Sequence, residues 1–344
     1  MGYRLTLLLF FLGLLAQSLG CNESVGPTDP LQHFIYFGLE RDRISDSTFL
    51  AIPSVAGAQL KYTWRELEPE EGQYDFESIR TALAFLDRAG MRLFIQLQDV
   101  SFSDEIVNVP DYLLDDPVYG GGVAQKYHFE DDNESSPVSA GWVARRWDPA
   151  VRHRFSALFQ AIAGEFDGRI AGINLAETSS GFGPNKAYHP VGYSYESYFE
   201  GILELMSLAR RAFQESDVII YANFMPGEEL PSDDQGFLRG VYEHADRIGV
   251  GVGGPDLLPQ RWFQRQNSLP LIRDRGQNTV AGMAVQYGNL DDVNRETGQR
   301  VTVPDLVRVA TDELRLDYIF WGTQEPHLSG EIYPYLEGIA GRDF

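Results

Sequence analysis

Eight short apolar runs recur along this chain, with amphipathic stretches between them. The runs have the length and composition of buried strands and occupy residues 33–39, 56–64, 91–98, 170–177, 217–224, 247–254, 279–288 and 317–324. The intervening stretches place apolar residues at i, i+3, i+4 and i+7, the spacing of one helix face, at residues 75–90, 149–166, 194–213 and 304–316. Strands that alternate with helices in this way form parallel βαβ units.

Eight such units predict an α/β protein built as a single (β/α)8 TIM-type barrel. The alternative is an open, doubly wound sheet, but no GxGxxG pattern follows the first apolar run to support it. The length of 344 residues suits the barrel, because barrels of this type use about 250 residues or more as one domain. We therefore predict one barrel domain over residues 32–344.

One connection, at about residues 100–148, is too long for an ordinary loop between a strand and a helix. Connections of this length are usually either functional or disordered. This one contains several aromatic residues, among them Tyr112, Tyr127, Trp142 and Trp147. Aromatic side chains favour an ordered structure, so we predict a lid or a cleft wall.

The first residues of the chain have the features of an export signal. Arg4 precedes an apolar run at residues 5–16, and small residues follow it before Cys21, the only cysteine. Residues 1–20 resemble the signal peptide of a bacterial lipoprotein, with Ser18 where leucine is usual. The resemblance implies cleavage before Cys21, a lipid anchor on Cys21 and a tether over residues 21–31. It places the protein in the cell envelope, on the outer membrane or the periplasmic face; the alternative is an ordinary periplasmic or secreted protein.

The charge balance narrows the choice of partners. The formal net charge is -22 at pH 7, which makes nucleic acid and anionic lipid unsuitable partners, so the membrane is reached only through the lipid anchor. The same charge argues against polyanionic substrates unless a local basic patch offsets it. The six histidines show no HxxxH or HxH spacing, so we predict neither a metal site nor a cofactor.

Polar and aromatic residues stand where most of the predicted strands end. In a barrel, the carboxyl ends of the strands form the active site. Glu177 ends the fourth run, which makes it the candidate general acid, although a carboxylate in a structural ion pair is an alternative role. Aromatic rings stack on sugar rings while amides and carboxylates bind hydroxyl groups, so the remaining strand ends predict a carbohydrate site. The predicted substrate-binding residues are Trp64, Gln98, Asp99, Asn174, Asp256, Gln286 and Trp321.

A passage at residues 62–97 resembles the second-strand to third-strand region of the (β/α)8 glycoside hydrolases of the large retaining clan, such as the family 42 β-galactosidases. The matching residues are Trp64, Glu68, Pro69, Gly72, Asp75 and Phe76. The resemblance implies an acid/base glutamate at the end of strand four, where Glu177 stands. Two positions depart from the pattern: Ala176 replaces the usual asparagine before the glutamate, and Gln286 occupies the place of the nucleophilic glutamate.

An amide cannot act as a nucleophile, so another carboxylate must take the second catalytic role. We assign this role to Glu325 at the end of the eighth run, with Asp256 and Asp99 as alternatives. The predicted function is an exported glycoside hydrolase that cleaves an oligosaccharide or polysaccharide by carboxylate acid/base catalysis. The alternative is a carbohydrate-binding lipoprotein on a catalytically degenerate barrel. A structural lipoprotein without a ligand would not need polar, aromatic strand ends.

Overall fold

The structure is a computed structural model that describes residues 31–129, 137–295 and 297–340. The predicted signal peptide, Cys21 and almost all of the predicted tether lie outside the described residues. Within those residues, no helix is both long enough and apolar enough to cross a membrane.

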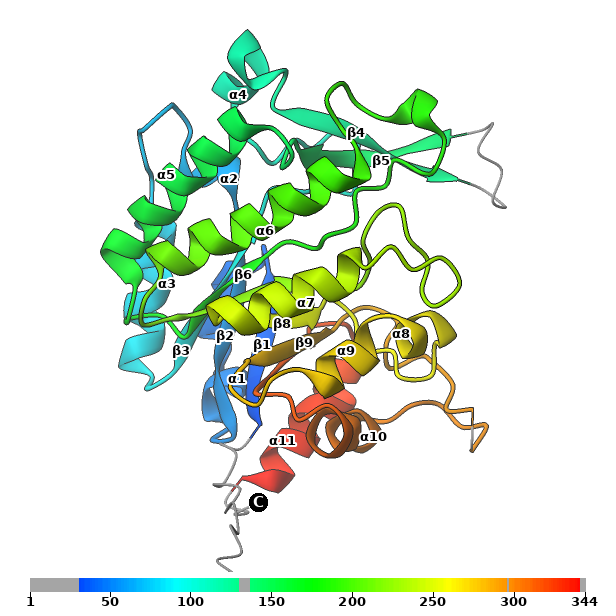
Figure 1. Ribbon diagram of the computed structural model, residues 1–344. Coiled ribbons are helices and arrows are strands. Elements are labelled where there is room, and N and C mark those ends of the chain that lie inside the picture. Colours follow the sequence, from blue (N-terminus) through cyan, green and yellow to red (C-terminus); the bar gives the residue numbers. More distant parts are fainter. Residues whose placement is uncertain (1–30, 130–136, 296, 341–344) are drawn as a thin grey trace, which may run out of the picture. The chain divides into compact units, whose positions relative to one another are not determined.

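Eight parallel strands close into a barrel, which confirms the predicted fold class (Figure 1). In chain order around the barrel they are β1 (Gln32–Gly38), β2 (Val55–Thr63), β3 (Arg92–Gln98), β6 (Gly172–Leu175), β7 (Asp217–Tyr221), β8 (Gly251–Gly254), β9 (Ala281–Val285) and β10 (Tyr318–Gly322). β10 pairs with β1 and completes the ring. Each of the eight predicted runs overlaps one of these strands.

Helices connect the strands and cover the outside of the barrel (Figure 1). Three predicted helices are α3 (Glu77–Arg88), α5 (Pro149–Phe166) and α6 (Tyr195–Ala212), and the fourth begins as α10 (Val303–Arg308) and continues as the π-helical turn η5 (Val309–Glu313). The other helical elements are η1 (Arg41–Ser45), α1 (Ser47–Ala51), α2 (Trp64–Leu67), α4 (Asp111–Asp115), η2 (Pro117–Tyr119), η4 (Lys186–Tyr188), α7 (Phe237–Ile248), α8 (Trp262–Gln266), α9 (Ser268–Asp274), η6 (Leu328–Ile332) and α11 (Tyr333–Ile339).

The sixth barrel strand begins later than predicted. The predicted run at 247–254 starts inside α7, which ends at Ile248. Gly249 follows with a φ of 71°, a left-handed conformation that glycine adopts without steric cost and that commonly ends a helix. β8 therefore comprises only Gly251–Gly254.

The long connection after β3 contains an antiparallel hairpin that the sequence pattern did not reveal. Its strands are β4 (Val123–Phe129) and β5 (Pro137–Ala144). The backbone N–H of Tyr127 donates a hydrogen bond of 2.7 Å to the carbonyl oxygen of Gly181. Through this bond the hairpin contacts the loop that follows Glu177, so the insertion forms part of the surroundings of the predicted site.

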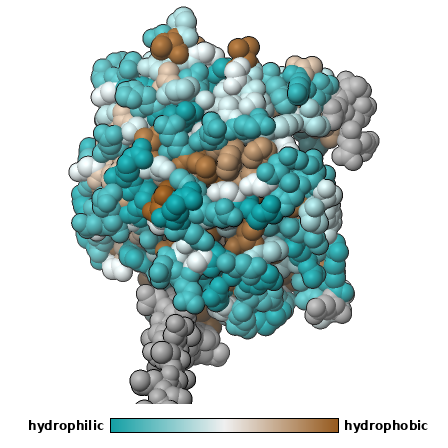
Figure 2. Space-filling model, viewed as in Figure 1, coloured by the Kyte–Doolittle hydropathy of each residue, from teal (hydrophilic) through white to brown (hydrophobic). Residues whose placement is uncertain are grey.

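Aromatic side chains fill the amino-terminal part of the barrel interior. Phe34, Phe94, Tyr318 and Phe320 are buried there, and the rings of Phe94 and Phe320 meet edge to face with centroids 5.0 Å apart. This packing fills the barrel interior near the amino-terminal ends of the strands. The carboxyl ends of the strands remain available for a ligand-binding site. The outer face seen in Figure 2 is mainly hydrophilic, with hydrophobic patches near its centre.

Candidate active site

Glu177 lies two residues beyond β6, at the carboxyl end of the fourth barrel strand. The side chain of Arg146 donates a hydrogen bond of 2.6 Å to the backbone carbonyl oxygen of Glu177. The next residue, Thr178, is also fixed, because its carbonyl oxygen accepts a hydrogen bond of 3.0 Å from the hydroxyl of Tyr198. The chain around Glu177 is therefore held in place by buried donors.

Arg146 and Asp99 form a buried ion pair beneath this segment. The guanidinium donates through Nε to Asp99 Oδ2 at 2.8 Å and through a terminal nitrogen to Oδ1 at 2.7 Å. The two side chains are only 1% and 4% exposed. Asp99, predicted to bind substrate, thus has both carboxylate oxygens bonded to Arg146 and acts in this structure as a support for Glu177.

The environment of Glu177 favours a protonated carboxyl group. Burial raises the pKa of Glu177 above its ordinary value, while the positive charges of Lys126 and Arg146 lower it and the negative charge of Asp256 adds a smaller increase. The net shift is upward. A glutamate that keeps its proton closer to neutral pH is suited to act as a general acid.

Asp256 is the carboxylate that acts on Glu177, and it lies just after β8. Burial raises the pKa of Asp256, and a hydrogen bond from Asn289 opposes this effect. Asn289 Nδ2 donates to Asp256 Oδ1 at 2.9 Å, and Asn289 Oδ1 accepts from the backbone N–H groups of Leu257 and Gln286. Asn289, which the sequence analysis did not identify, therefore joins the loops after β8 and β9.

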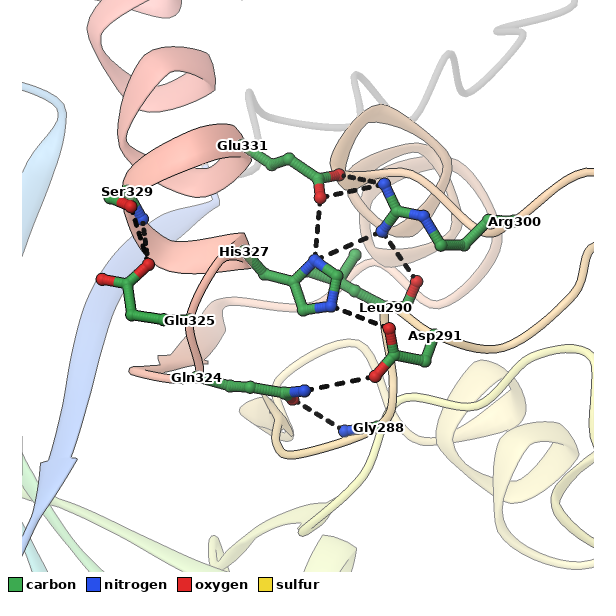
Figure 3. Close-up of polar contacts among 9 residues, drawn as sticks. All are labelled: Gly288, Leu290, Asp291, Arg300, Gln324, Glu325, His327, Ser329 and Glu331. Atoms are coloured by element: carbon green, nitrogen blue, oxygen red, sulfur yellow. Dashed lines mark hydrogen bonds and ion pairs between the residues drawn. The ribbon is translucent and has the colours of Figure 1, made fainter.

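Glu325 has a different set of contacts. Its carboxylate is exposed and accepts hydrogen bonds from the Ser329 hydroxyl at 2.7 Å and the Ser329 N–H at 3.2 Å. Figure 3 shows it directed toward Ser329 and away from the cluster around His327. It borders a separate cavity of about 240 Å³ together with Arg43, Asp46 and Tyr333, and it is not among the charges that shift the pKa of Glu177.

Figure 3 also shows a cluster of polar contacts around His327. His327 lies between Asp291 and Glu331, with nitrogen–oxygen distances of 2.9 and 2.8 Å. Arg300 contacts both oxygens of Glu331 at 2.9 Å. Gln324, at the end of β10, joins Asp291 at 3.2 Å. These contacts connect the loop after β9 to the loop after β10. The charged side chains of the cluster are paired with one another, which indicates a structural role.

The two predicted sugar platforms, Trp64 and Trp321, are core residues. Both side chains are 0% exposed, so neither ring has a face for a sugar. Trp64 Nε1 donates to Glu68 at 2.8 Å and its ring packs on Phe155 with centroids 3.9 Å apart. Trp321 Nε1 donates to His33 Nδ1 at 3.1 Å. Helices and neighbouring strands cover these rings. Their position at a strand end in the sequence therefore did not reveal that they are buried.

The predicted amides are divided between the core and the site. Gln98 donates to the carbonyl oxygen of Val100 at 3.0 Å. Asn174 is fully buried and donates to the carbonyl oxygens of Leu175 and Ile219, each at 3.2 Å. Gln286 is half-buried, and among the described residues no hydrogen bond is formed by its side chain. Gln286 is therefore the predicted amide that is available to a ligand.

Polar atoms without partners gather in the upper part of the barrel interior. Within the described residues, no hydrogen bond satisfies Gln96 Oε1, Asn174 Oδ1 or Asn223 Oδ1. Buried polar groups are normally hydrogen-bonded, and groups left without a protein partner bond to water or to a ligand. These three oxygen atoms are therefore candidates for hydrogen bonds to ordered water or to a ligand.

A groove and a set of exposed rings complete the site. The groove has a volume of about 550 Å³ and lies between the loop after β6, from Ser179 onward, and the loop after β7; its lining includes Phe182, Tyr195, Phe224 and Met225. Glu177 and Asp256 are not among its lining residues. Exposed aromatic side chains follow four barrel strands: Phe102, Phe224, Trp262 and Tyr287. Among these, Phe224 and Tyr287 stood at the ends of predicted strands; Phe102 and Trp262 lie in loops whose exposure has no sequence signature.

Among the described residues, no group of three histidine, cysteine, aspartate or glutamate side chains is arranged to hold a metal ion. No protein-family model matches the chain. No curated protein matches it either.

Solved structures resemble the chain in fold. A GH10 endoxylanase retrieved from a sugarcane soil metagenome has a TM-score of 0.50 at 12% identity, over 86% of this chain and 87% of that one. The catalytic domain of β-amylase from Paenibacillus polymyxa has a TM-score of 0.49 at 12% identity, over 92% and 100%. Xylanase 10B from Thermotoga petrophila, in complex with xylobiose, has a TM-score of 0.47 at 10% identity, over 85% and 82%. The endoxylanase likeness shows a shared (β/α)8 barrel fold.

Proposed function

We propose that the protein is a glycoside hydrolase that cleaves an oligosaccharide or polysaccharide at the carboxyl end of the barrel. The observation that carries the proposal is Glu177, a half-buried residue whose carboxyl has a raised pKa and which stands at the end of the fourth barrel strand. Glycoside hydrolysis requires two carboxyl groups, one of which must donate a proton to the departing sugar oxygen. Glu177 has the position for that donation, and its raised pKa favours the protonated form.

Asp256 takes the second catalytic role in this proposal, in place of Glu325. Its carboxyl is partly buried, its electric field acts on Glu177, and one of its oxygens is held by Asn289. The other oxygen has no hydrogen bond from a described residue and is open to a water molecule or a sugar carbon. Glu325, in contrast, has one carboxylate oxygen bonded twice to Ser329 beside another cavity.

The surroundings of the two carboxyl groups suit a carbohydrate. Sugars offer C–H faces that stack on aromatic rings and hydroxyl groups that need fixed polar partners. The exposed rings of Phe102, Phe224 and Tyr287 and the free amide of Gln286 provide both kinds of contact. The endoxylanase named above shares the barrel fold, and its substrate class agrees with this proposal.

The proposal is tested by incubating the purified protein with a panel of polysaccharides and measuring new reducing ends. Glu177→Gln and Asp256→Asn should each lower turnover by about 10²–10⁴-fold, the usual scale of general acid–base catalysis, while binding persists. Glu325→Gln separates the two assignments: a loss of turnover there, with none in Asp256→Asn, would return the second role to Glu325. The anomeric form of the first product identifies the step, since inversion means that Asp256 activates water and retention that it attacks the sugar.

One observation favours a second candidate, a carbohydrate-binding lipoprotein without catalytic turnover. Gln286 occupies the end of the seventh barrel strand, where the resembling hydrolases carry their nucleophile, and an amide cannot form the glycosyl intermediate. The second candidate predicts that the wild-type protein binds a glycan without cleaving it. It further predicts that Gln286→Glu creates turnover, whereas the hydrolase proposal predicts activity in the wild-type protein.

A further inference from the structure

Lysine is rare in this chain, and its placement is uneven. The sequence contains 28 lysine and arginine residues, of which only Lys61, Lys126 and Lys186 are lysines. Among the described residues, every ion pair within 4.0 Å has arginine or histidine as its cation. Arginine therefore serves the structural ion pairs, and two of the three lysines lie at the carboxyl end of the barrel.

Lys126 extends from the β4–β5 hairpin toward Glu177. Lys126 is 5% exposed. Among the negative charges that act on its ammonium group, that of Glu177 has the largest effect. Its ammonium lies 3.8 Å from the centroid of the Phe102 ring, and its hydrogen bond is a long one, 3.5 Å to the carbonyl oxygen of Ser101. Within the described residues, no carboxylate oxygen lies within ion-pair distance. The positive charge of Lys126 is thus buried, and the ring contact and the long hydrogen bond stabilise it only weakly.

Lys61 approaches the site from the second barrel strand. It stands two residues beyond Gln59, whose side chain is fully buried, and it pairs in register with Gln96 on β3. Its ammonium lies 5.8 Å from the centroid of the Tyr36 ring, which packs against the aromatic cluster of the barrel interior. Alternation along β2 therefore turns Lys61 inward, at the mouth of the barrel. Like Lys126, it has no carboxylate partner among the described residues.

We propose that the glycan bound at this site is anionic, and that its carboxylate or sulfate group is bound by Lys126 and Lys61. The proposal rests on the proposed carbohydrate site and names its substrate class. A buried ammonium without a partner is costly, and a bound anion removes that cost by supplying the missing charge and acceptors. Lysine suits this task because its compact ammonium can bind a single oxygen of a mobile ligand, whereas the fork of arginine is suited to fixed bidentate pairs.

The local charge balance permits an anion despite the net charge of -22 for the whole chain. Arg146 and Asp99 cancel each other as a bidentate pair. Glu177 must carry its proton to act as an acid. Asp256 then remains as a negative charge near Glu177, and Glu228, Glu229 and Asp233 line the groove. The local basic patch that an anionic substrate would require is therefore confined to the two lysines.

The contact between Lys126 and Phe102 adds specificity to the proposal. The Phe102 side chain is 66% exposed while its ring lies against the ammonium. A ligand that reaches Lys126 therefore meets an exposed aromatic face at the same place. An acidic sugar offers both required surfaces, an apolar ring face and a charged substituent on the same unit.

The experiment measures binding by calorimetry with matched pairs of oligosaccharides. Galacturonate, alginate and glucuronoxylan oligomers are compared with their carboxyl-reduced forms, and carrageenan oligomers with their desulfated forms, which separates carboxylate from sulfate as the source of charge. We expect one charged ligand to bind at least 10-fold more tightly than its neutral form, with the difference reduced at high salt. Lys126→Met and Lys61→Met should each remove most of this preference. Lys126→Arg should retain part of it.

Lys186→Met is the matched control, because it deletes the same charge from an exposed position in η4. It should leave the preference unchanged. Thermal unfolding of each variant identifies any that fails to fold, in which case Lys61→Met, at a half-buried position, decides the test. A pH profile of turnover is measured for Lys126→Met wherever a cleaved substrate is found.

The outcomes separate this proposal from the proposed function. Neutral oligosaccharides that bind as tightly as their charged forms and are cleaved would overturn the anionic substrate and leave the hydrolase. Charged ligands that bind through both lysines without cleavage would support the anionic ligand and overturn the hydrolase. A Lys126→Met variant that alters only the pH profile, with the preference intact, would show that Lys126 acts on Glu177 alone and would overturn the proposal. Absence of binding by every ligand would overturn both.

Discussion

Arg146 donates a hydrogen bond of 2.6 Å to the carbonyl oxygen of Glu177 while it holds both carboxylate oxygens of Asp99. The three residues come from three different segments: the end of β3, the approach to α5 and the end of β6. A single buried guanidinium therefore fixes the candidate acid relative to the barrel. Its fork geometry allows this, since arginine presents five donors in one plane.

Asp99→Asn should destabilise the protein strongly, because it leaves the buried Arg146 charge without its partner. Breaking a buried pair by removing one member costs about 3–5 kcal/mol of unfolding free energy. Urea denaturation measures the loss. Glu165→Gln is the control, because it breaks the more exposed pair with Arg80, and such a pair contributes at most about 1 kcal/mol. Equal losses in the two variants would contradict the structural role of Asp99.

Glu177→Gln should stabilise the folded protein at neutral pH. The raised pKa means that the folded state binds the Glu177 proton more tightly than the unfolded state does. Stability therefore falls as the pH rises above the ordinary glutamate value of 4.5, and glutamine removes this dependence. The midpoint of thermal unfolding at pH 4 and pH 7 measures it. A variant that is less stable than the wild-type protein at pH 7 would contradict the raised pKa.

Two aromatic substitutions distinguish a core ring from a binding ring. Trp321→Ala should lower the unfolding free energy by about 3–5 kcal/mol, because it opens a cavity in the packed core. Phe224 borders the groove and is 37% exposed. Phe224→Ala should leave stability nearly unchanged and weaken glycan binding by about 1–3 kcal/mol. Denaturant unfolding and calorimetry give the two values, and unaltered binding in Phe224→Ala would exclude the groove as the glycan site.

Acid should destabilise the protein through His33. Burial lowers the pKa of His33 from its ordinary value of 6.5 to about 4. The unfolded chain gains this proton below pH 6.5 but the folded protein only near pH 4, so stability falls as the pH decreases between these values, by about 3 kcal/mol. His33→Asn keeps an acceptor for Trp321 and should flatten this part of the dependence. Parallel pH curves for the two proteins would show that His33 titrates normally.

The lipid anchor remains a prediction of the sequence. The mature protein should begin at Cys21, carry lipid and partition into detergent, because an apolar segment followed by small residues precedes this lone cysteine. Cys21→Ser should release the protein from the membrane fraction. Mass spectrometry checks the mature amino terminus, and an unmodified terminus downstream of Cys21 would exclude the anchor.

The barrel could be predicted from the sequence because its signals are local. A buried parallel strand needs a short apolar run and a crossover helix needs a 3.6-residue period, and both are visible in a window of a few residues. The place of Glu177 followed from the same information, since an end of a strand is a local feature. The strands β4 and β5 were missed because their pairing depends on a partner and on contact with the loop that contains Gly181.

The partners of the site residues were decided only by the tertiary structure. Asp99 and Arg146 are separated by 47 residues, and nothing near either one predicts that they form a buried pair. Trp64 and Trp321 end strands as a sugar platform would, yet helix packing and the contact with His33 bury them. Glu325 and Asp256 both follow strands, but the loops after those strands turn one carboxylate to Ser329 and the other to Asn289. Local periodicity determines which segments become strands, whereas the direction of a side chain beyond a strand end depends on contacts between segments distant in the sequence.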